Sequence, residues 1–229
     1  MLFGVIALMW HDADTWQSLR RIWSLPFGTA IGEGLMVAQI IGGIAILIPR
    51  ISRAGFIVLS VVYALFSLAC VPGIIARPAV YAQYGSFFEQ FSLLCGAVAG
   101  YVSSNATRAR SALGRTARVG LGLCAVSFTL AQIFYFRLTA GLVPAWIPPN
   151  QTFWAALTTV AFALAAIAIL INRRAQLAMR LMSIMLTLFG LLVWVPQLIA
   201  HPESHGNWSE FALNYLIAGA TWLVSVIAR

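Results

Sequence analysis

Two long stretches of this chain resemble each other: IAILIPRISRAGFIVLSVVYALFSLACVPGIIARP (residues 44–78) and IAILINRRAQLAMRLMSIMLTLFGLLVWVPQLIAHP (residues 167–202). Each is an apolar run interrupted near its start by a short basic turn, and each ends shortly after a shared proline. The second stretch has one extra residue just before that proline, which is Pro72 in the first copy and Pro196 in the second. The pairing predicts that the chain contains an internal repeat.

The match continues beyond these stretches, where YGSFFEQF is followed in the second copy by HGNWSEFA. This alignment places Gly85 opposite Gly206 and Glu89 opposite Glu210. The chain is therefore interpreted as two copies of a four-helix unit, joined by the basic stretch NATRARSALGRTARVG. An even number of helices in each unit gives both copies the same orientation, which is a parallel repeat.

The composition indicates a membrane protein. The 229 residues are 61% hydrophobic and only 9% charged, whereas soluble proteins carry about 25% charged residues. The net charge of +8 comes from fourteen arginines, which stand in small groups between apolar runs and not on one soluble face. That spacing is typical of residues flanking membrane spans and argues against nucleic-acid binding.

A helix that crosses the hydrocarbon core needs about 20 mainly apolar residues. This length predicts an all-α polytopic protein with about eight transmembrane helices. The runs are too long and too weakly alternating for barrel strands. The first is the weakest, because its apolar part MLFGVIALMW stops at Trp10; we interpret it as a retained helix and not as a cleaved signal peptide. The expected spans are 1–20, 27–48, 54–76, 86–104, 116–138, 152–171, 177–200 and 208–228. The expected domains are a first four-helix unit at 1–104, a basic cytoplasmic linker at 105–115 and a second unit at 116–229.

The arginines also predict the orientation, because positive residues concentrate on the cytoplasmic side of membrane proteins. Ten arginines fall in the loops after the second, fourth and sixth spans and at the C-terminus, and only Arg20, Arg21, Arg77 and Arg137 fall on the other side. We therefore expect a multi-pass protein of the bacterial inner membrane with both termini in the cytoplasm.

Most of the remaining polar side chains collect at the expected outer face, which suggests a polar pocket there. The candidate pocket residues are His11, Asp12, Asp14, Glu33, Arg77, Arg137, His201 and His205. Seven of the eight tryptophans also lie on this side. An interfacial aromatic belt explains them, while a wall for a flat ring such as a quinone is the alternative, with Trp146 and Trp208 as candidate stacking residues.

The two aligned glutamates have a structural interpretation. SFFE and NWSE match the capping-box pattern, in which a residue such as Ser86 or Asn207 caps a helix and the glutamate three positions later bonds back. We therefore expect Glu89 and Glu210 to be helix caps. His201 and His205 flank a proline and precede a glycine, which favours a solvated turn over a metal or haem site.

Polar residues inside the spans are expected to hold helices together. Gln39, Gln132 and Asn214 lie deepest and are predicted to bond between helices. Glu33 lies about one turn inside its helix, so we expect it either to form an ion pair with a basic residue or to be an active carboxylate. Small-residue faces and apolar core cysteines complete the packing, at Gly28, Gly32, Gly96 and Gly100 and at Cys70, Cys95 and Cys124.

Two stretches of the second copy, TAGLVPAWIPPNQTFWAALTTVAFALAAIAIL (residues 139–170) and VWVPQLIAHPESHGNWSEFALNYLIAGATWLV (residues 193–224), resemble the DoxX-like family of bacterial membrane proteins. The resemblance implies a compact four-helix unit, and some members are similar to the membrane subunit of thiosulfate:quinone oxidoreductase. The family often carries a glutamate or histidine midway along the second helix of the unit, where this chain has Gln39 and Phe162.

Three functions remain open at this point. The first is a redox-associated membrane subunit that holds a quinone at the outer face, together with a redox partner protein. The second is a small-solute transporter, and the third is a non-catalytic scaffold that docks a partner through its outer loops. No catalytic residue is assigned, because no nucleophile–base pair or phosphate loop occurs in the sequence.

Overall fold

A computed structural model describes residues 1–10, 17–104 and 112–228. The regular elements of these residues are all helical, which confirms the all-α class. The helices are α1 (Leu2–Trp10), α2 (Gln17–Trp23), α3 (Gly28–Ala45), α4 (Ser52–Ala76), α5 (Tyr81–Ser103), α6 (Ala112–Phe134), α7 (Phe136–Leu142), α8 (Gln151–Leu170), α9 (Ala175–Phe189), the π-helix η2 (Gly190–Trp194), α10 (Val195–Ala200) and α11 (His205–Ile227).

Six helical segments in the described parts of the chain are long and apolar enough to cross a membrane. They are Gly28–Ala45, Ser52–Ala76, Ala112–Phe134, Gln151–Leu170, Ala175–Ala200 and His205–Ile227. The protein is therefore a candidate multi-pass membrane protein, with a lipid bilayer as its surroundings. The first expected span forms two short helices, α1 and α2, and residues 11–16 between them lie outside the described residues.

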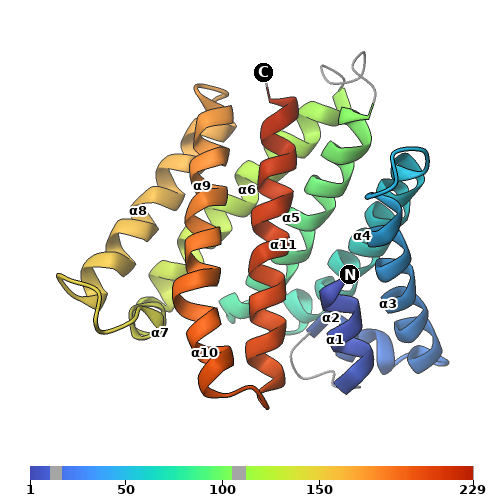
Figure 1. The fold of residues 1–229 in the computed structure, drawn as a ribbon, viewed down its shortest axis with the longest axis horizontal. Coiled ribbons are helices and arrows are strands. Elements are labelled where there is room, and N and C mark those ends of the chain that lie inside the picture. Colours follow the sequence, from blue (N-terminus) through green and yellow to red (C-terminus); the bar gives the residue numbers. More distant parts are fainter. Residues whose placement is uncertain (11–16, 105–111, 229) are drawn as a thin grey trace.

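Helix α5 has the length of a span but is more polar than the six. Its buried residues include Gln83, Gln90 and Ser92, and its position explains how it can carry them. It packs against α4, α6 and α11, so much of its surface contacts protein (Figure 1). A helix so enclosed does not need a continuous apolar surface.

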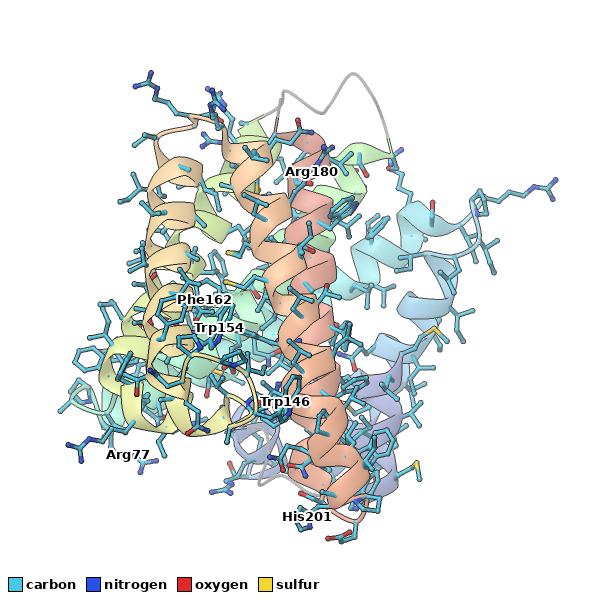
Figure 2. All side chains as sticks on the ribbon, turned by 60° about the vertical axis from the view of Figure 1, so that its left-hand side comes forward. Arg77, Trp146, Trp154, Phe162, Arg180 and His201 are labelled. Atoms are coloured by element: carbon cyan, nitrogen blue, oxygen red, sulfur yellow. The ribbon has the colours of Figure 1, made fainter. Side chains whose placement is uncertain are left out.

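The bundle has two different ends (Figure 1). The C-terminus, the α8–α9 turn and the α3–α4 turn lie at the upper end of the view, and α7 and the α10–α11 turn lie at the lower end. Arg180 lies at the first end, and Arg77 and His201 lie at the other (Figure 2). The loops that we expected on one side of the membrane thus share one end of the bundle.

Helices α5 and α11 cross closely in the middle of the bundle (Figure 1). A Cβ atom placed on Gly96 of α5 would overlap Ala220 of α11, and one on Gly100 would overlap the ring of Phe56 from α4. The other glycine pair also marks a close approach, because a Cβ atom on Gly28 or Gly32 would overlap the end of α2. The predicted small-residue faces are confirmed as sites of close helix approach.

The two long stretches that align in the sequence differ in local structure. Helix α4 remains α-helical through Pro72, whereas the corresponding segment after α9 is the π-helix η2. A π-helix accommodates an additional residue without ending the helix. The extra residue of the second copy is therefore absorbed just before Pro196, and the ring of Tyr215 from α11 packs against Gly190 there.

Candidate functional site: an aromatic cavity with two carboxylates

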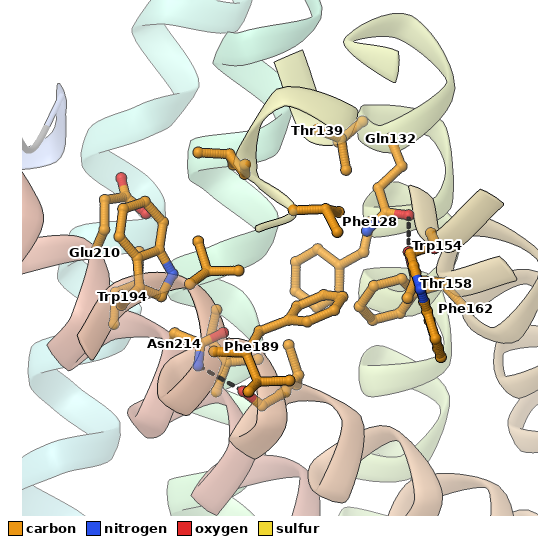
Figure 3. A pocket seen from close by; sticks show the side chains of 18 of the residues that line it. Phe128, Gln132, Thr139, Trp154, Thr158, Phe162, Phe189, Trp194, Glu210 and Asn214 are labelled. Atoms are coloured by element: carbon orange, nitrogen blue, oxygen red, sulfur yellow. Dashed lines mark hydrogen bonds between the residues drawn. The ribbon is translucent and has the colours of Figure 1, made fainter. Parts of the chain in front are cut away.

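A cavity of about 310 Å³ lies within the second half of the chain. Its walls come from α6, α7, α8, α9, η2 and α11 and from the loop after α7, and α5 contributes Glu89 (Figure 3). Three consecutive π-helical residues, Leu192, Val193 and Trp194, all line it. The wider π turn thus presents more consecutive side chains to the cavity than an α-helical turn would.

Most of the cavity wall is apolar and much of it is aromatic. Phe128 of α6 and Phe162 of α8 meet edge to face, with ring centroids 5.8 Å apart. Phe189 and Trp154 also line the cavity (Figure 3). The indole N–H of Trp154 donates to the carbonyl oxygen of Pro148 at 2.9 Å, which fixes the ring against the loop that precedes α8.

The amide side chains of the cavity are engaged between helices. The Gln132 carbonyl oxygen on α6 accepts hydrogen bonds from the hydroxyls of Thr158 (3.3 Å) and Thr159 (2.8 Å) on α8. The Asn214 amide on α11 donates to the backbone carbonyl oxygen of Leu186 on α9 at 2.7 Å. These bonds confirm the predicted role of both residues as interhelical contacts.

The interpretation of Glu89 and Glu210 as helix caps is wrong. Helix α5 begins at Tyr81, eight residues before Glu89, and α11 begins at His205, five residues before Glu210. The cap of α11 is instead Ser204, whose hydroxyl oxygen accepts from an amide of the first turn. Both glutamates face the cavity and are therefore available to a ligand.

Tertiary contacts replace the missing side-chain cap of α5. Val80 precedes the helix and provides no capping side chain. The free backbone amide of Ala82 donates instead to the hydroxyl of Tyr135, which lies between α6 and α7. The Tyr81 hydroxyl in turn contacts Ser127 of α6 at 2.9 Å. Contacts with α6 and Tyr135 thus set the start of α5 five residues before the expected span at 86–104.

The electrostatics of the cavity are unbalanced. None of the described residues that line it is basic, although the whole chain carries a net charge of +8. Glu89 is half-buried and Glu210 is exposed, and the two are close enough to interact electrostatically. Two ionised carboxylates repel each other, and the repulsion grows where apolar walls exclude water from between them.

The corresponding core of the first half is filled. In the alignment of the two long stretches and the residues before them, Gln39, Tyr63 and Phe66 stand opposite Phe162, Leu186 and Phe189. All three are buried, and the Gln39 amide donates to the Tyr63 hydroxyl at 3.1 Å. A hydrogen-bonded, packed core thus stands in the first half where the second half has its cavity.

The residues expected to form an outer pocket do not line this cavity. His11, Asp12 and Asp14 lie outside the described residues, and Glu33 is half-buried on α3. Arg77, Arg137 and His201 are exposed. The described members lie on separate elements: Glu33 on α3, Arg77 at the end of α4, Arg137 on α7, His201 at the end of α10 and His205 on α11.

The histidines and the two proposed stacking tryptophans have other contacts. The ring of His205 stacks on Trp10, with centroids 5.3 Å apart, and His201 lies 3.3 Å from the Glu203 carboxylate. Trp208 donates its indole N–H to the carbonyl oxygen of Pro202. Trp146 is 71% exposed at the end of the bundle that carries Arg77 (Figure 2).

Sequence reasoning missed the cavity's aromatic residues, especially Trp154 and Trp194. Both were counted in the interfacial belt, and only the extra residue before Pro196 distinguished Trp194. The predicted burial of Cys70, Cys95 and Cys124 is confirmed. Within the described ranges, no group of three or more His, Cys, Asp or Glu side chains is arranged to hold a metal ion.

Comparison with protein-family models, with curated proteins and with solved structures finds no significant match to this chain.

Proposed function

We propose that the chain lies in the bacterial inner membrane as two tandem four-helix units of the DoxX-like type with both termini directed to the cytoplasm. Of the eight spans, the first is only partial, because α1 has nine residues and a full crossing needs about 20. The packing order supports the duplication: α3, α4 and α5 follow one another as α8, α9 and α11 do. Helix α6 packs on α5 as α1 packs on α11, and α2 and α7 are short helices at matching places. The larger number of arginines in the segments expected on the side that carries Arg180 supports the orientation.

We further propose that the second unit binds a small, ring-bearing lipophilic molecule taken from the bilayer. The cavity carries this proposal, because its volume of about 310 Å³ lies at the lower end of the range of small-molecule pockets. Aromatic side chains from the four elements α6, α8, α9 and η2 supply faces and edges for a flat ring. A quinone, which the DoxX-like resemblance suggests, is the first member of this class to test.

The polar contacts favour binding over transport of a polar solute. A transporter needs polar groups at mid-depth that can contact the solute. Gln132 and Asn214 already bond to neighbouring helices, so much of their hydrogen-bonding capacity is used for packing.

A cavity-filling substitution tests the proposal. Ala131 lines the cavity, so Ala131→Phe places a ring inside it. Ala156→Phe adds the same ring to an exposed position of α8 and serves as the matched control. Binding of a short-chain benzoquinone is measured by calorimetry on each protein in nanodiscs, and the purified protein is checked for co-extracted ring compounds by mass spectrometry of its lipid extract.

We expect Ala131→Phe to weaken binding at least tenfold and Ala156→Phe to leave it unchanged. Gel filtration verifies that both variants remain monodisperse. Equal affinity of Ala131→Phe and the wild type for every ring compound that binds would place the binding elsewhere and refute the proposal.

A further inference from the structure

The carboxylates of the cavity lack partners. Among the described residues, neither the Glu89 nor the Glu210 side-chain carboxylate takes part in a hydrogen bond or an ion pair, although the Glu89 backbone carbonyl oxygen accepts from Ser92. Charged groups within a membrane protein are expensive unless another charge or a hydrogen bond compensates them. Both side chains face a space large enough for a ligand, so the compensating group has room to enter.

The charge that is missing from the walls is positive. No described basic side chain lines the cavity, and the two carboxylates raise each other's electrostatic energy. A single positive charge placed between them offsets this repulsion and gains attraction to both. A neutral ligand offers no such attraction, so one carboxyl group must then hold a proton to remove the repulsion.

The aromatic walls favour the same kind of ligand. Glu210, Trp194 and Asn214 lie at one end of the cavity in Figure 3, and Trp154, Phe128 and Phe162 lie at the other. A cation close to an aromatic face is attracted by the ring, most strongly by tryptophan. The remaining phenyl rings form an apolar site for the body of the ligand.

The two carboxylates, when ionised, suit a cation better than a quinone. The carbonyl oxygens of a quinone accept hydrogen bonds, and an ionised carboxylate also only accepts them, so Glu89 and Glu210 donate to a quinone only when they are protonated. The indole N–H of Trp154 and one amide N–H of Asn214 already donate to backbone carbonyl oxygens, which leaves the Gln132 amide nitrogen and the Trp194 indole as N–H donors in the wall. An ammonium group, by contrast, suits acceptors and anions.

We propose that the ligand of this cavity is a small lipophilic organic cation: an amine or quaternary ammonium group held between Glu89 and Glu210, with an aromatic or aliphatic body against the phenyl rings. This inference rests on the proposed binding function and names its ligand class.

Two probes of the same shape test the charge alone. Benzyltrimethylammonium and neopentylbenzene differ by a positive nitrogen in place of a carbon, and the quaternary charge does not change with pH. Binding of each is measured by saturation-transfer NMR on the full chain in nanodiscs of phosphatidylglycerol, so that no lipid headgroup supplies the cation. We expect the wild type to bind the cation at least tenfold more tightly than the neutral probe.

Variants assign the preference to the carboxylates. Glu89→Gln and Glu210→Gln are each expected to reduce the preference for the cation at least threefold, while binding of the neutral probe is retained. Glu203→Gln, an exposed carboxylate outside the cavity, is the control and should change neither. Retained binding of the neutral probe shows that a glutamine variant is folded.

The outcomes separate the two proposals. Equal binding of both probes to the wild type, or tighter binding of the neutral probe or the benzoquinone, overturns the cationic ligand and leaves the binding function standing. A cation preference that survives both glutamine substitutions also overturns it. No binding of either probe or of the benzoquinone overturns both proposals.

Discussion

The buried contact between Gln39 and Tyr63 gives the sharpest test of packing in the first half. Gln39 is fully buried on α3, and its amide nitrogen donates to the Tyr63 hydroxyl on α4 at 3.1 Å. Its carbonyl oxygen, also buried, has no hydrogen-bond partner. The pair therefore combines one interhelical bond with one unsatisfied acceptor.

The hydrogen bond and the unsatisfied acceptor contribute free energies of different size. An interhelical hydrogen bond in a membrane protein contributes about 0.6 kcal/mol on average and about 1.7 kcal/mol at most. A buried polar group without a partner costs about 1–3 kcal/mol. Tyr63→Phe alone leaves the whole buried Gln39 amide without a hydrogen-bond partner. It is therefore expected to lower the free energy of unfolding by about 1–3 kcal/mol. The double variant Gln39→Met with Tyr63→Phe removes both groups at nearly constant volume, so we expect a net stabilisation of roughly 0.5–2.5 kcal/mol.

The free energy of unfolding is measured for the wild type, both single variants and the double variant, by titration from mild detergent into SDS. This double-mutant cycle isolates the coupling between the two side chains. A double variant less stable than the wild type by more than about 1 kcal/mol would refute the reasoning, because the Gln39 carbonyl oxygen would then have a partner that stabilises the fold.

Three further predictions test the packing, a helix cap and the topology. Gly96→Ala should destabilise the fold by about 1–3 kcal/mol, because the added methyl group overlaps α11. The control Gly219→Ala adds a methyl group in open space and should be neutral or stabilise the fold by up to about 1 kcal/mol. Both are measured in the same SDS titration. Asn150→Ala removes the acceptor that caps α8 at 2.8 Å and should cost about 0.5–2 kcal/mol, while unchanged unfolding would show that this cap contributes nothing. On a background lacking the three native cysteines, Ala145→Cys should react with an impermeant thiol reagent added to intact cells, and Ser104→Cys should react only after lysis; the reverse result would invert the proposed orientation.

The sequence predicted the helices well, because a hydrophobic run long enough to cross lipid leaves the backbone few alternatives. Six of the seven later expected spans each correspond to one helix whose ends lie within five residues of the prediction, and the span 177–200 corresponds to α9, η2 and α10 together. Polar residues with one dominant role, such as Gln132 and Asn214, were also interpreted correctly, because an amide inside a bundle almost always bonds to a neighbouring helix.

The site could not be predicted in the same way. The SFFE pattern suggested a cap, but contacts of Tyr81 and Ala82 with α6 begin the helix earlier and carry Glu89 into the interior. The cavity depends on the shapes of side chains from several helices and on one π turn before Pro196. Neither a hydropathy pattern nor a local motif contains that information.

On the proposed duplication, the π-helix η2 has a consequence for how such a chain can evolve. In a homodimer of identical four-helix subunits, an inserted residue would appear on both sides of the assembly, and both cores would change together. In a fused tandem duplication, the same insertion alters only one half. The first half keeps its tight packing and preserves the stability of the protein. The second half can therefore lose some packing density and gain a ligand-binding cavity.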